Sequence, residues 1–227
     1  MGKLQIISES SEPFQNRIEA GKLLLNYLEK FKTDKTVVLG IPRGGVIIAN
    51  EIAVGLKAAM DIVLTHKIGA PGNKELAVGA ISENGSLFVN ESIADYVGAD
   101  QPYIEREKKY QLQEIESKVQ LYREILPKLE LKEKIVIITD DGVATGATMQ
   151  AALWAIRQKK PEKLILALPV GPEDAITKLS KDADDTICLK TPQYFEALNR
   201  FYIEFNQVED EHLLRIFEQE NKRRKNK

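Results

Sequence analysis

Cysteine is almost absent from this sequence, because Cys188 is the only one among its 227 residues. A single thiol excludes an intramolecular disulfide and a multi-cysteine zinc site. Cys188 lies in the apolar run 186–189, where we expect it to pack within a strand. The chain also lacks both an apolar run near the roughly 20 residues that span a bilayer and an N-terminal secretion signal. We therefore expect a cytoplasmic protein that does not contact a membrane.

A large net charge is also missing, since 32 basic residues stand against 34 acidic ones and the formal net charge is -2. Such a balance gives no field that would attract nucleic acid or anionic lipid, so neither is expected as a partner. Residues 222–225 form a locally basic stretch that we expect to be a frayed, solvated terminus. The 43% hydrophobic content indicates a folded protein, and the length predicts one domain over residues 1–227.

Short apolar runs alternate along the chain with segments of helical periodicity. The predicted strands cover residues 36–39, 61–65, 134–139, 164–170 and 185–189. The predicted helices cover residues 13–31, 46–56, 146–158, 174–180 and 208–220. Because the strands are continuously apolar, this alternation predicts an α/β fold whose mostly parallel sheet is covered by helices on both faces.

The middle of the chain interrupts this alternation. Residues 67–74 contain glycine and proline, so we expect an irregular loop that leaves the sheet. Asn84-Gly85 lies between two alternating segments and predicts a hairpin. Residues 101–126 are highly charged with a narrow apolar stripe, which predicts a long and mostly solvated helix. We expect residues 66–90 to form a loop followed by a small flap or edge hairpin beside the sheet.

The turn after the most apolar strand carries the clearest chemical pattern. Ligands of parallel sheets bind beyond the carboxyl ends of the strands, and here Asp140 and Asp141 precede a loop of small residues that opens a helix. The loop amides and the hydroxyls of Thr145 and Thr148 can bind phosphate, while the carboxylates can accept hydrogen bonds from sugar hydroxyls. A ribose phosphate satisfies both halves. The Gly-Lys-Ser/Thr ending of a Walker A loop and the dinucleotide glycine fingerprint are absent.

Residues 136–149, which read VIITDDGVATGATM, resemble the phosphoribosyl diphosphate (PRPP) motif of type I phosphoribosyltransferases. The resemblance extends over about residues 13 to 190. It implies the fold of that family, with a central, mostly parallel sheet flanked by helices, a flexible lid loop and a small hood. It further implies that Asp140 and Asp141 hold the ribose hydroxyls. The expected 5-phosphate contacts are Val143, Ala144, Thr145, Gly146, Ala147 and Thr148.

Ala144 bears on the acceptor. It stands where the hypoxanthine and guanine enzymes of the family carry an aspartate, so the motif is similar to the adenine-type version. This similarity does not fix adenine as the substrate.

Two further segments resemble parts of the same family. Pro42-Arg43-Gly44-Gly45 is similar to its diphosphate-binding loop, which implies diphosphate contacts from Arg43, Gly44 and Gly45. Residues 66–75 are similar to its mobile lid, which makes Lys67 the first candidate and Lys74 the second for stabilising departing diphosphate. His66 stands where the family often has arginine.

Two roles stay open at this point. Glu75 is a candidate general acid or base, with an ordinary exposed glutamate as the alternative. The hood and C-terminal helix are expected over residues 191–222, where Phe201 or Tyr202 is a candidate for stacking on an acceptor base. Packing in the core or in a dimer is the alternative for these two rings.

The resemblance implies an enzyme of nucleotide metabolism, a phosphoribosyltransferase that displaces diphosphate from PRPP with an unidentified nitrogenous base. It also implies Mg²⁺ bound mainly through PRPP, without a protein residue identified as its ligand, and a homodimer. Two alternatives remain open. One is a non-catalytic regulator that senses PRPP or a nucleotide on the same fold, and the other is a hydrolase that acts on a ribose phosphate.

Overall fold

The structure is a computed structural model that describes residues 3–226. Within this range, six parallel strands form a sheet in the order β1-β9-β8-β7-β2-β3. Their bounds are β1 (Lys3–Ser8), β2 (Thr36–Gly40), β3 (Ala59–Ile62), β7 (Ile135–Thr139), β8 (Lys163–Val170) and β9 (Asp185–Lys190). The α/β fold with a central parallel sheet is therefore confirmed.

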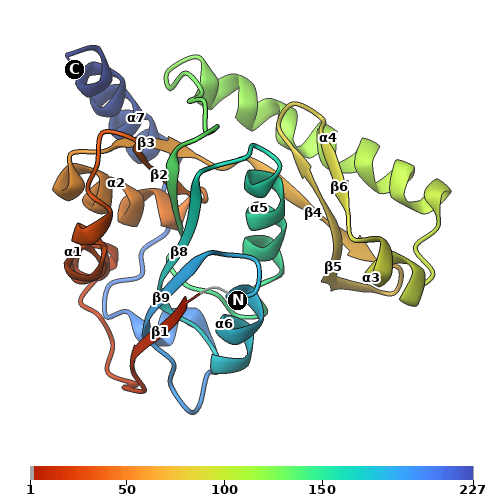
Figure 1. Cartoon of the computed structure of the whole chain (residues 1–227), viewed down its shortest axis with the longest axis horizontal. Coiled ribbons are helices and arrows are strands. Elements are labelled where there is room, and N and C mark those ends of the chain that lie inside the picture. The colour runs from red at the N-terminus through yellow and green to blue at the C-terminus, as the bar shows by residue number, and fades with distance from the viewer. Residues whose placement is uncertain (1–2, 227) are drawn as a thin grey trace.

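Helices cover both faces of this sheet (Figure 1). One face carries α1 (Arg17–Leu28) and α2 (Gly44–Leu56), with the short 3-10 helix η1 (Glu29–Phe31) after α1. The other face carries α5 (Ala147–Arg157) and α6 (Glu173–Leu179). In β7, Ile137 packs toward α1 and α2, whereas Val136 and Ile138 pack toward α5 and α6. The strand is apolar throughout because both of its faces are buried.

Strand β1 has no counterpart in the sequence analysis. It pairs in parallel with β9 at the edge of the sheet and is only half-buried. Its polar residues and short length gave no clear strand pattern. Cys188 lies buried in β9, as expected for a packing thiol, and burial raises its pKa to about 12.

Residues 65–89 form a second, antiparallel sheet, and the expectation of an irregular loop over residues 67–74 was wrong. The strands are β4 (Thr65–Ala70), β5 (Asn73–Ser82) and β6 (Leu87–Val89). Gly72 has a φ of 74° and forms the β4–β5 turn together with Pro71. At Gly69 the register shifts, and a Cβ there would lie 2.8 Å from the Lys74 Cα. The glycines and the proline therefore build the turn and the bulge of a hairpin.

This small sheet lies between two helices. On one side, alanines of β5 pack against alanines of α5, and the Phe88 and Trp154 rings are 5.2 Å apart. On the other side lies α4 (Gln101–Arg123), which Figure 1 shows running along the outside of the hairpins after the short helix α3 (Glu91–Tyr96). The predicted hairpin around Asn84-Gly85 and the predicted long helix are both confirmed.

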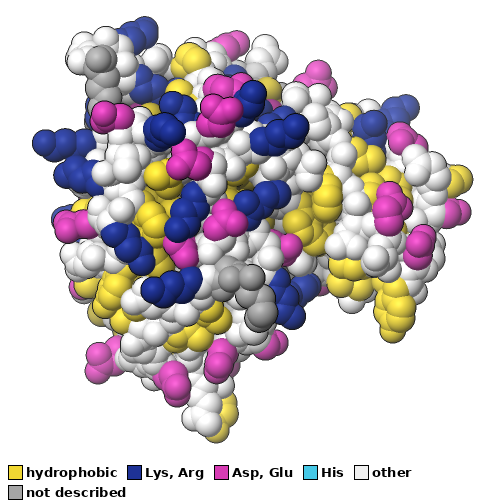
Figure 2. Space-filling view, viewed as in Figure 1, with side chains coloured by type: hydrophobic (Ala, Val, Ile, Leu, Met, Phe, Trp, Pro, Cys, Tyr) yellow, Lys and Arg dark blue, Asp and Glu magenta, His cyan; other side chains and the backbone are white. Residues whose placement is uncertain are grey.

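The C-terminal segment begins with the 3-10 helix η2 (Leu198–Phe201) and ends with α7 (Asp210–Lys225). The basic stretch 222–225 is not a frayed terminus, because it completes the last turn of α7 and its arginines bind the body of the protein. Figure 2 shows basic and acidic side chains interspersed over one face of the molecule. None of the helices described is both long enough and apolar enough to cross a bilayer.

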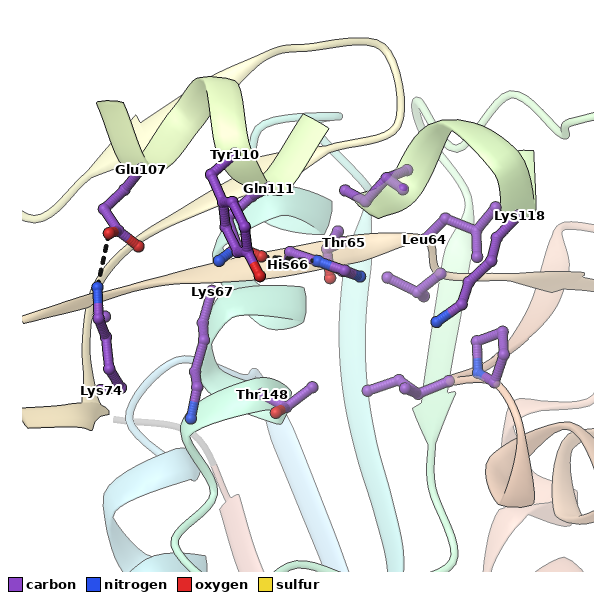
Figure 3. Close-up of a pocket in the computed structure, with 15 residues that line it drawn as sticks. Leu64, Thr65, His66, Lys67, Lys74, Glu107, Tyr110, Gln111, Lys118 and Thr148 are labelled. Carbon is purple, nitrogen blue, oxygen red and sulfur yellow. Dashed lines mark hydrogen bonds and ion pairs between the residues drawn. The ribbon is translucent and has the colours of Figure 1, made fainter. Parts of the chain in front are cut away.

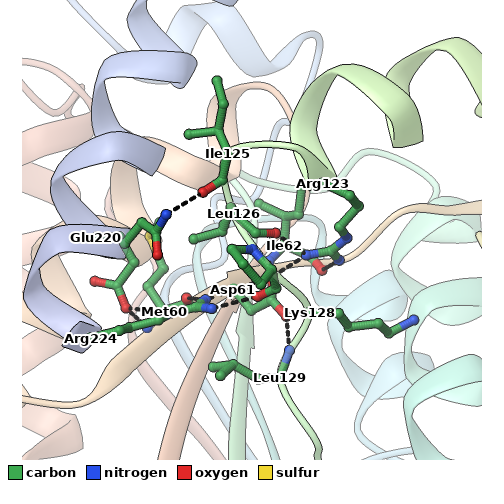
Figure 4. Close-up of polar contacts among 12 residues, drawn as sticks. Met60, Asp61, Ile62, Arg123, Ile125, Leu126, Lys128, Leu129, Glu220 and Arg224 are labelled. Atoms are coloured by element: carbon green, nitrogen blue, oxygen red, sulfur yellow. Dashed lines mark hydrogen bonds and ion pairs between the residues drawn. The ribbon is translucent and has the colours of Figure 1, made fainter.

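Charged side chains cover the free edge of β3 (Figure 4). The Met60 amide donates to Glu220 Oε1 at 2.8 Å, and the Met60 carbonyl accepts from Arg224. The Ile62 carbonyl accepts from Arg123 of α4 at 3.1 Å. These contacts satisfy backbone groups that an edge strand would otherwise leave open, and they tie α4 and α7 to the same strand.

Replacing Glu220 with alanine should destabilise the fold. The side chain is buried, and its loss leaves the Met60 amide without its acceptor and removes the carboxylate shared by Arg223 and Arg224. We expect the free energy of unfolding, measured in urea, to fall by about 2–4 kcal/mol. The control is Glu218→Ala, at an exposed position of the same helix, which should change it by less than about 0.5 kcal/mol. Equal losses in the two variants would contradict this role of Glu220.

Candidate active site

The carboxyl ends of β2 and β7 bring two of the predicted loops together. The strands are neighbours in parallel register, with Gly40 opposite Thr139, and the Ile41 amide donates to the Thr139 carbonyl at 3.1 Å. The loop 41–45 therefore lies directly beside Asp140 and Asp141. The two segments that resembled diphosphate-binding and ribose-binding loops are adjacent in space, at the carboxyl ends of neighbouring parallel strands.

Gly44 and Gly45 make this contact possible because a side chain at either position would collide with the acidic pair. A Cβ at Gly44 would lie 1.9 Å from Asp141 Oδ2, and a Cβ at Gly45 would lie 2.8 Å from the Asp140 Cα. The peptide bond between Pro42 and Arg43 is cis. Helix α2 begins at Gly44, so the loop ends at the positive end of a helix beside two carboxylates.

Asp140 and Asp141 form a crowded acidic pair. Burial raises the pKa of Asp140 well above its ordinary value, and the neighbouring Asp141 charge raises it further. The Asp140 carboxylate accepts a hydrogen bond from the Asp141 amide at 2.8 Å, which acts in the opposite direction. Burial also raises the pKa of Asp141, although the Arg17 charge opposes that rise. The fold therefore holds two carboxylates in a place where their ionisation is costly.

Arg17 is the functional candidate that the sequence analysis missed. It is the first residue of α1, its Nε donates to Asp141 Oδ2 at 2.8 Å, and its side chain is only 11% exposed. The guanidinium also lies 3.9 Å from the centroid of the Phe205 ring and donates to the Asn206 carbonyl at 3.0 Å. Arg17 is thus the counter-charge of the acidic pair. An arginine 124 residues from its partner carries no local signal of this role.

The loop after the acidic pair presents an exposed rim at the start of α5. Val143, Gly146 and Ala147 are buried and shape the loop, and Gly146 caps the helix with a φ of 75°. The exposed residues are Ala144, Thr145 and Thr148. Two exposed hydroxyls therefore lie at the positive end of an 11-residue helix, which suits an anion.

Lys67 and Glu75, two site residues predicted from the sequence, bring the β4–β5 hairpin to this rim. The ammonium group of Lys67 lies 2.8 Å from Glu75 Oε1, and the Thr145 hydroxyl donates to Glu75 Oε2 at 3.3 Å. The Lys67 charge and hydrogen bond lower the pKa of Glu75, so this carboxylate is ionised at neutral pH. Lys74 is held elsewhere, 2.6 Å from Glu107 of α4. Of the two lysines proposed for the diphosphate, Lys67 is the one at the loop.

The Arg43 side chain turns away from the loops. Its Nε lies 3.2 Å from Asp210 Oδ1, at the start of α7, and its Nη1 donates to the Val208 carbonyl at 3.2 Å. The Tyr122 hydroxyl of α4 donates to the same Asp210 carboxylate at 2.7 Å. Arg43 therefore anchors the glycine loop to α4 and α7, and its charge is already paired in this conformation.

Phe201 and Tyr202, the candidate acceptor contacts, are 3% and 4% exposed. The Phe201 ring stacks on Phe195 at 5.0 Å, and the Tyr202 ring lies 5.5 Å from Phe14. The Tyr202 hydroxyl donates to the Asp141 carbonyl at 2.6 Å. Neither ring has a free face for a base, so the geometry supports the packing alternative and gives Tyr202 a supporting contact under the acidic pair.

A cavity of about 670 Å³ adjoins the site between β4 and α4 (Figure 3). Pro42, Lys67 and Thr148 line the part that touches the loops. Nowhere in residues 3–226 do three or more histidine, cysteine, aspartate or glutamate side chains converge as they do at a dedicated metal centre. Asp140 and Asp141 nevertheless offer carboxylate oxygens, and these suit a hydrated Mg²⁺ whose remaining ligands come from a substrate.

The raised pKa of Asp140 predicts a pH-dependent penalty on stability. When the folded-state pKa is above the unfolded value, the folded state binds more protons, so stability falls as the pH rises through that interval. Asp140→Asn keeps an acceptor for the Asp141 amide and removes the charge. It should raise the thermal midpoint at pH 7 by about 2–4 °C. The gain should shrink as the pH falls toward about 4.

The midpoint can be followed by circular dichroism over that pH range. Asp34→Asn, at an exposed position, is the control and should leave the midpoint unchanged. A loss of stability in Asp140→Asn at every pH would contradict the claim that ionisation of Asp140 destabilises the fold.

Residues 14–206 match the family described as Phosphoribosyl transferase domain. The chain is 35% identical over 201 residues to the Mycobacterium tuberculosis protein named Putative phosphoribosyl transferase Rv0571c, covering 88% of this chain and 45% of that protein. It thus spans less than half the length of this curated relative. Among solved structures, TT1426 from Thermus thermophilus is similar with a TM-score of 0.86 and 40% identity, covering 91% of this chain and 98% of that one. The resemblance seen in the sequence is confirmed, and the chain belongs to the type I phosphoribosyltransferase family.

Proposed function

We propose that this protein binds PRPP with Mg²⁺ and transfers its phosphoribosyl group to a nitrogenous base, with release of diphosphate. The observation that carries the proposal is the convergence of the acidic pair, the glycine loop and the start of α5 at one edge of the sheet. Each of the three suits a different part of PRPP. We infer further that the enzyme acts in the cytoplasm, which its single buried thiol suits, and that it forms a homodimer, as the family resemblance implies.

In this proposal Asp140 and Asp141 hold the ribose. Their oxygens accept hydrogen bonds from its hydroxyls, and their charge offsets the positive charge that develops at the anomeric carbon as diphosphate leaves. Arg17 keeps Asp141 oriented and limits the repulsion between the two carboxylates. The exposed hydroxyls of Thr145 and Thr148 and the start of α5 receive the 5-phosphate.

The glycine loop and Lys67 bind the leaving diphosphate. Backbone amides at Gly44 and Gly45 lie at the start of α2, where a negative charge is favoured. Lys67 reaches the loop from β4 and exchanges its contact with Glu75 for the ligand. Because Glu75 is ionised and bonded to Thr145, we assign it a role in holding the hairpin against the phosphate loop ahead of a role as a general acid.

Mg²⁺ would be held by Asp140 or Asp141 together with oxygens of PRPP, and it would supply charge stabilisation to the leaving group. The chain's own residues orient the ribose and hold the 5-phosphate and the diphosphate of PRPP. Such positioning is a large part of catalysis in a displacement reaction. No described residue identifies the base, and the similarity of Ala144 to the adenine-type motif makes adenine the first acceptor to test.

The proposal is tested by measuring diphosphate release from PRPP and Mg²⁺ with a panel of purine and pyrimidine bases and a control without base. Release that depends on one base is the expected result. Release without any base would identify a hydrolase of the ribose phosphate. Absence of release despite measurable PRPP binding would identify a regulator.

A double variant tests the site itself. Asp140→Asn with Asp141→Asn should weaken PRPP binding, measured by titration calorimetry, at least about tenfold, since each carboxylate loses charge-assisted hydrogen bonds. Its circular dichroism spectrum should match that of the wild type. Asp95→Asn, an exposed position on α3, is the matched control. Unchanged affinity in the double variant would remove the ribose assignment.

A further inference from the structure

The cavity between β4 and α4 extends well beyond the loops of the candidate site. Its volume of about 670 Å³ lies in the range of sites for small molecules and cofactors. One end touches Pro42 and Thr148 beside the loops, and the other reaches Lys74 and Glu107. A diphosphate at the glycine loop would fill only the first part. The remainder has room for a second chemical group.

The cavity carries an excess of positive charge. Its lining includes Lys67, Lys74 and Lys118 but only one carboxylate among the described residues, that of Glu107. Glu107 is taken by Lys74 at 2.6 Å, and Lys67 is paired with the exposed Glu75. No carboxylate in residues 3–226 lies within ion-pair distance of the exposed Lys118, which Figure 3 shows extending from α4 into the cavity. An anion is the ligand that this arrangement favours.

The rest of the lining suits a flat, partly apolar group. Val63, Leu64 and Ile115 give the cavity an apolar wall. Tyr110 of α4 is 58% exposed, and Figure 3 shows its ring extending from the helix toward Lys67. A tyrosine with an open face is a stacking platform for a base. Gln111 adds a polar group, held by its contact with His66 Nδ1 at 2.8 Å.

We propose that this cavity binds a nucleoside diphosphate, with the phosphates between Lys67 and Lys118 and the base against Tyr110. The cavity shares Lys67 and Pro42 with the expected diphosphate site, so an occupant excludes the diphosphate group of PRPP. The nucleotide would therefore inhibit competitively with PRPP. This regulatory consequence rests on the proposed function, whereas the binding itself does not.

The test is a calorimetric titration with adenosine 5'-diphosphate. The background is the Asp140→Asn, Asp141→Asn protein, in which the ribose site is disabled, so that the nucleotide cannot bind there as a product would. Lys118→Gln should weaken binding about tenfold, because a phosphate loses a charge-assisted contact. Tyr110→Ala should also weaken it about tenfold through lost stacking. Lys109→Gln changes an exposed lysine of α4 that does not line the cavity, and it should change affinity less than about twofold.

Three results would overturn the proposal. The first is no binding of the nucleotide, and the second is an equal loss of affinity in Lys118→Gln and Lys109→Gln. The third is that inorganic diphosphate binds as tightly as the nucleotide and that Tyr110→Ala leaves its affinity unchanged. Circular dichroism confirms that each variant is folded. Failure of the transferase proposal would look different, since base-dependent diphosphate release would then be missing while the nucleotide titration kept its dependence on Lys118 and Tyr110.

Discussion

The rest of the structure depends on holding two adjacent carboxylates, Asp140 and Asp141, at the end of β7. Burial and mutual repulsion both oppose their ionisation, and the surroundings act against that penalty. Arg17 supplies the opposite charge from α1, and the glycines of the neighbouring loop bring the amides of a helix start close to the pair. Two carboxylates held against such a penalty are typical of a functional site.

The second sheet shows how the site is enclosed. Its β5 strand packs through alanines on α5, the helix that begins at the phosphate loop, so the hairpin and the loop share one support. Helix α4 covers the other side of this sheet, and its Tyr122 meets the Asp210 carboxylate that also binds Arg43. The charged contacts at the edge of β3 tie α4 and α7 to the central sheet. The glycine loop, the hairpin and the C-terminal helix are thus mechanically connected.

Much of this arrangement could be predicted where the signal is local. Strand β7, the small-residue loop and α5 follow one another in the sequence, and their pattern alone indicated a phosphate site. Glycine and proline in residues 67–74 misled the prediction, because a bulge and a tight turn use the same residues as a loop. No local pattern indicates the role of Arg17, because that role depends on a contact with Asp141, 124 residues away. The burial of Tyr202 likewise depends on Phe14, which tertiary packing alone brings to it.

The bridge from Lys67 through Glu75 to Thr145 is the contact that a phosphate ligand at this loop would replace. Glu75 is exposed and the Lys67 side chain is 23% exposed, so this ion pair contributes at most about 1 kcal/mol and a ligand can replace it at little cost. A phosphate ligand between them would displace water and strengthen every charge contact around it. The exchange of contacts would be driven by the ligand, because only the bound state gains these stronger contacts.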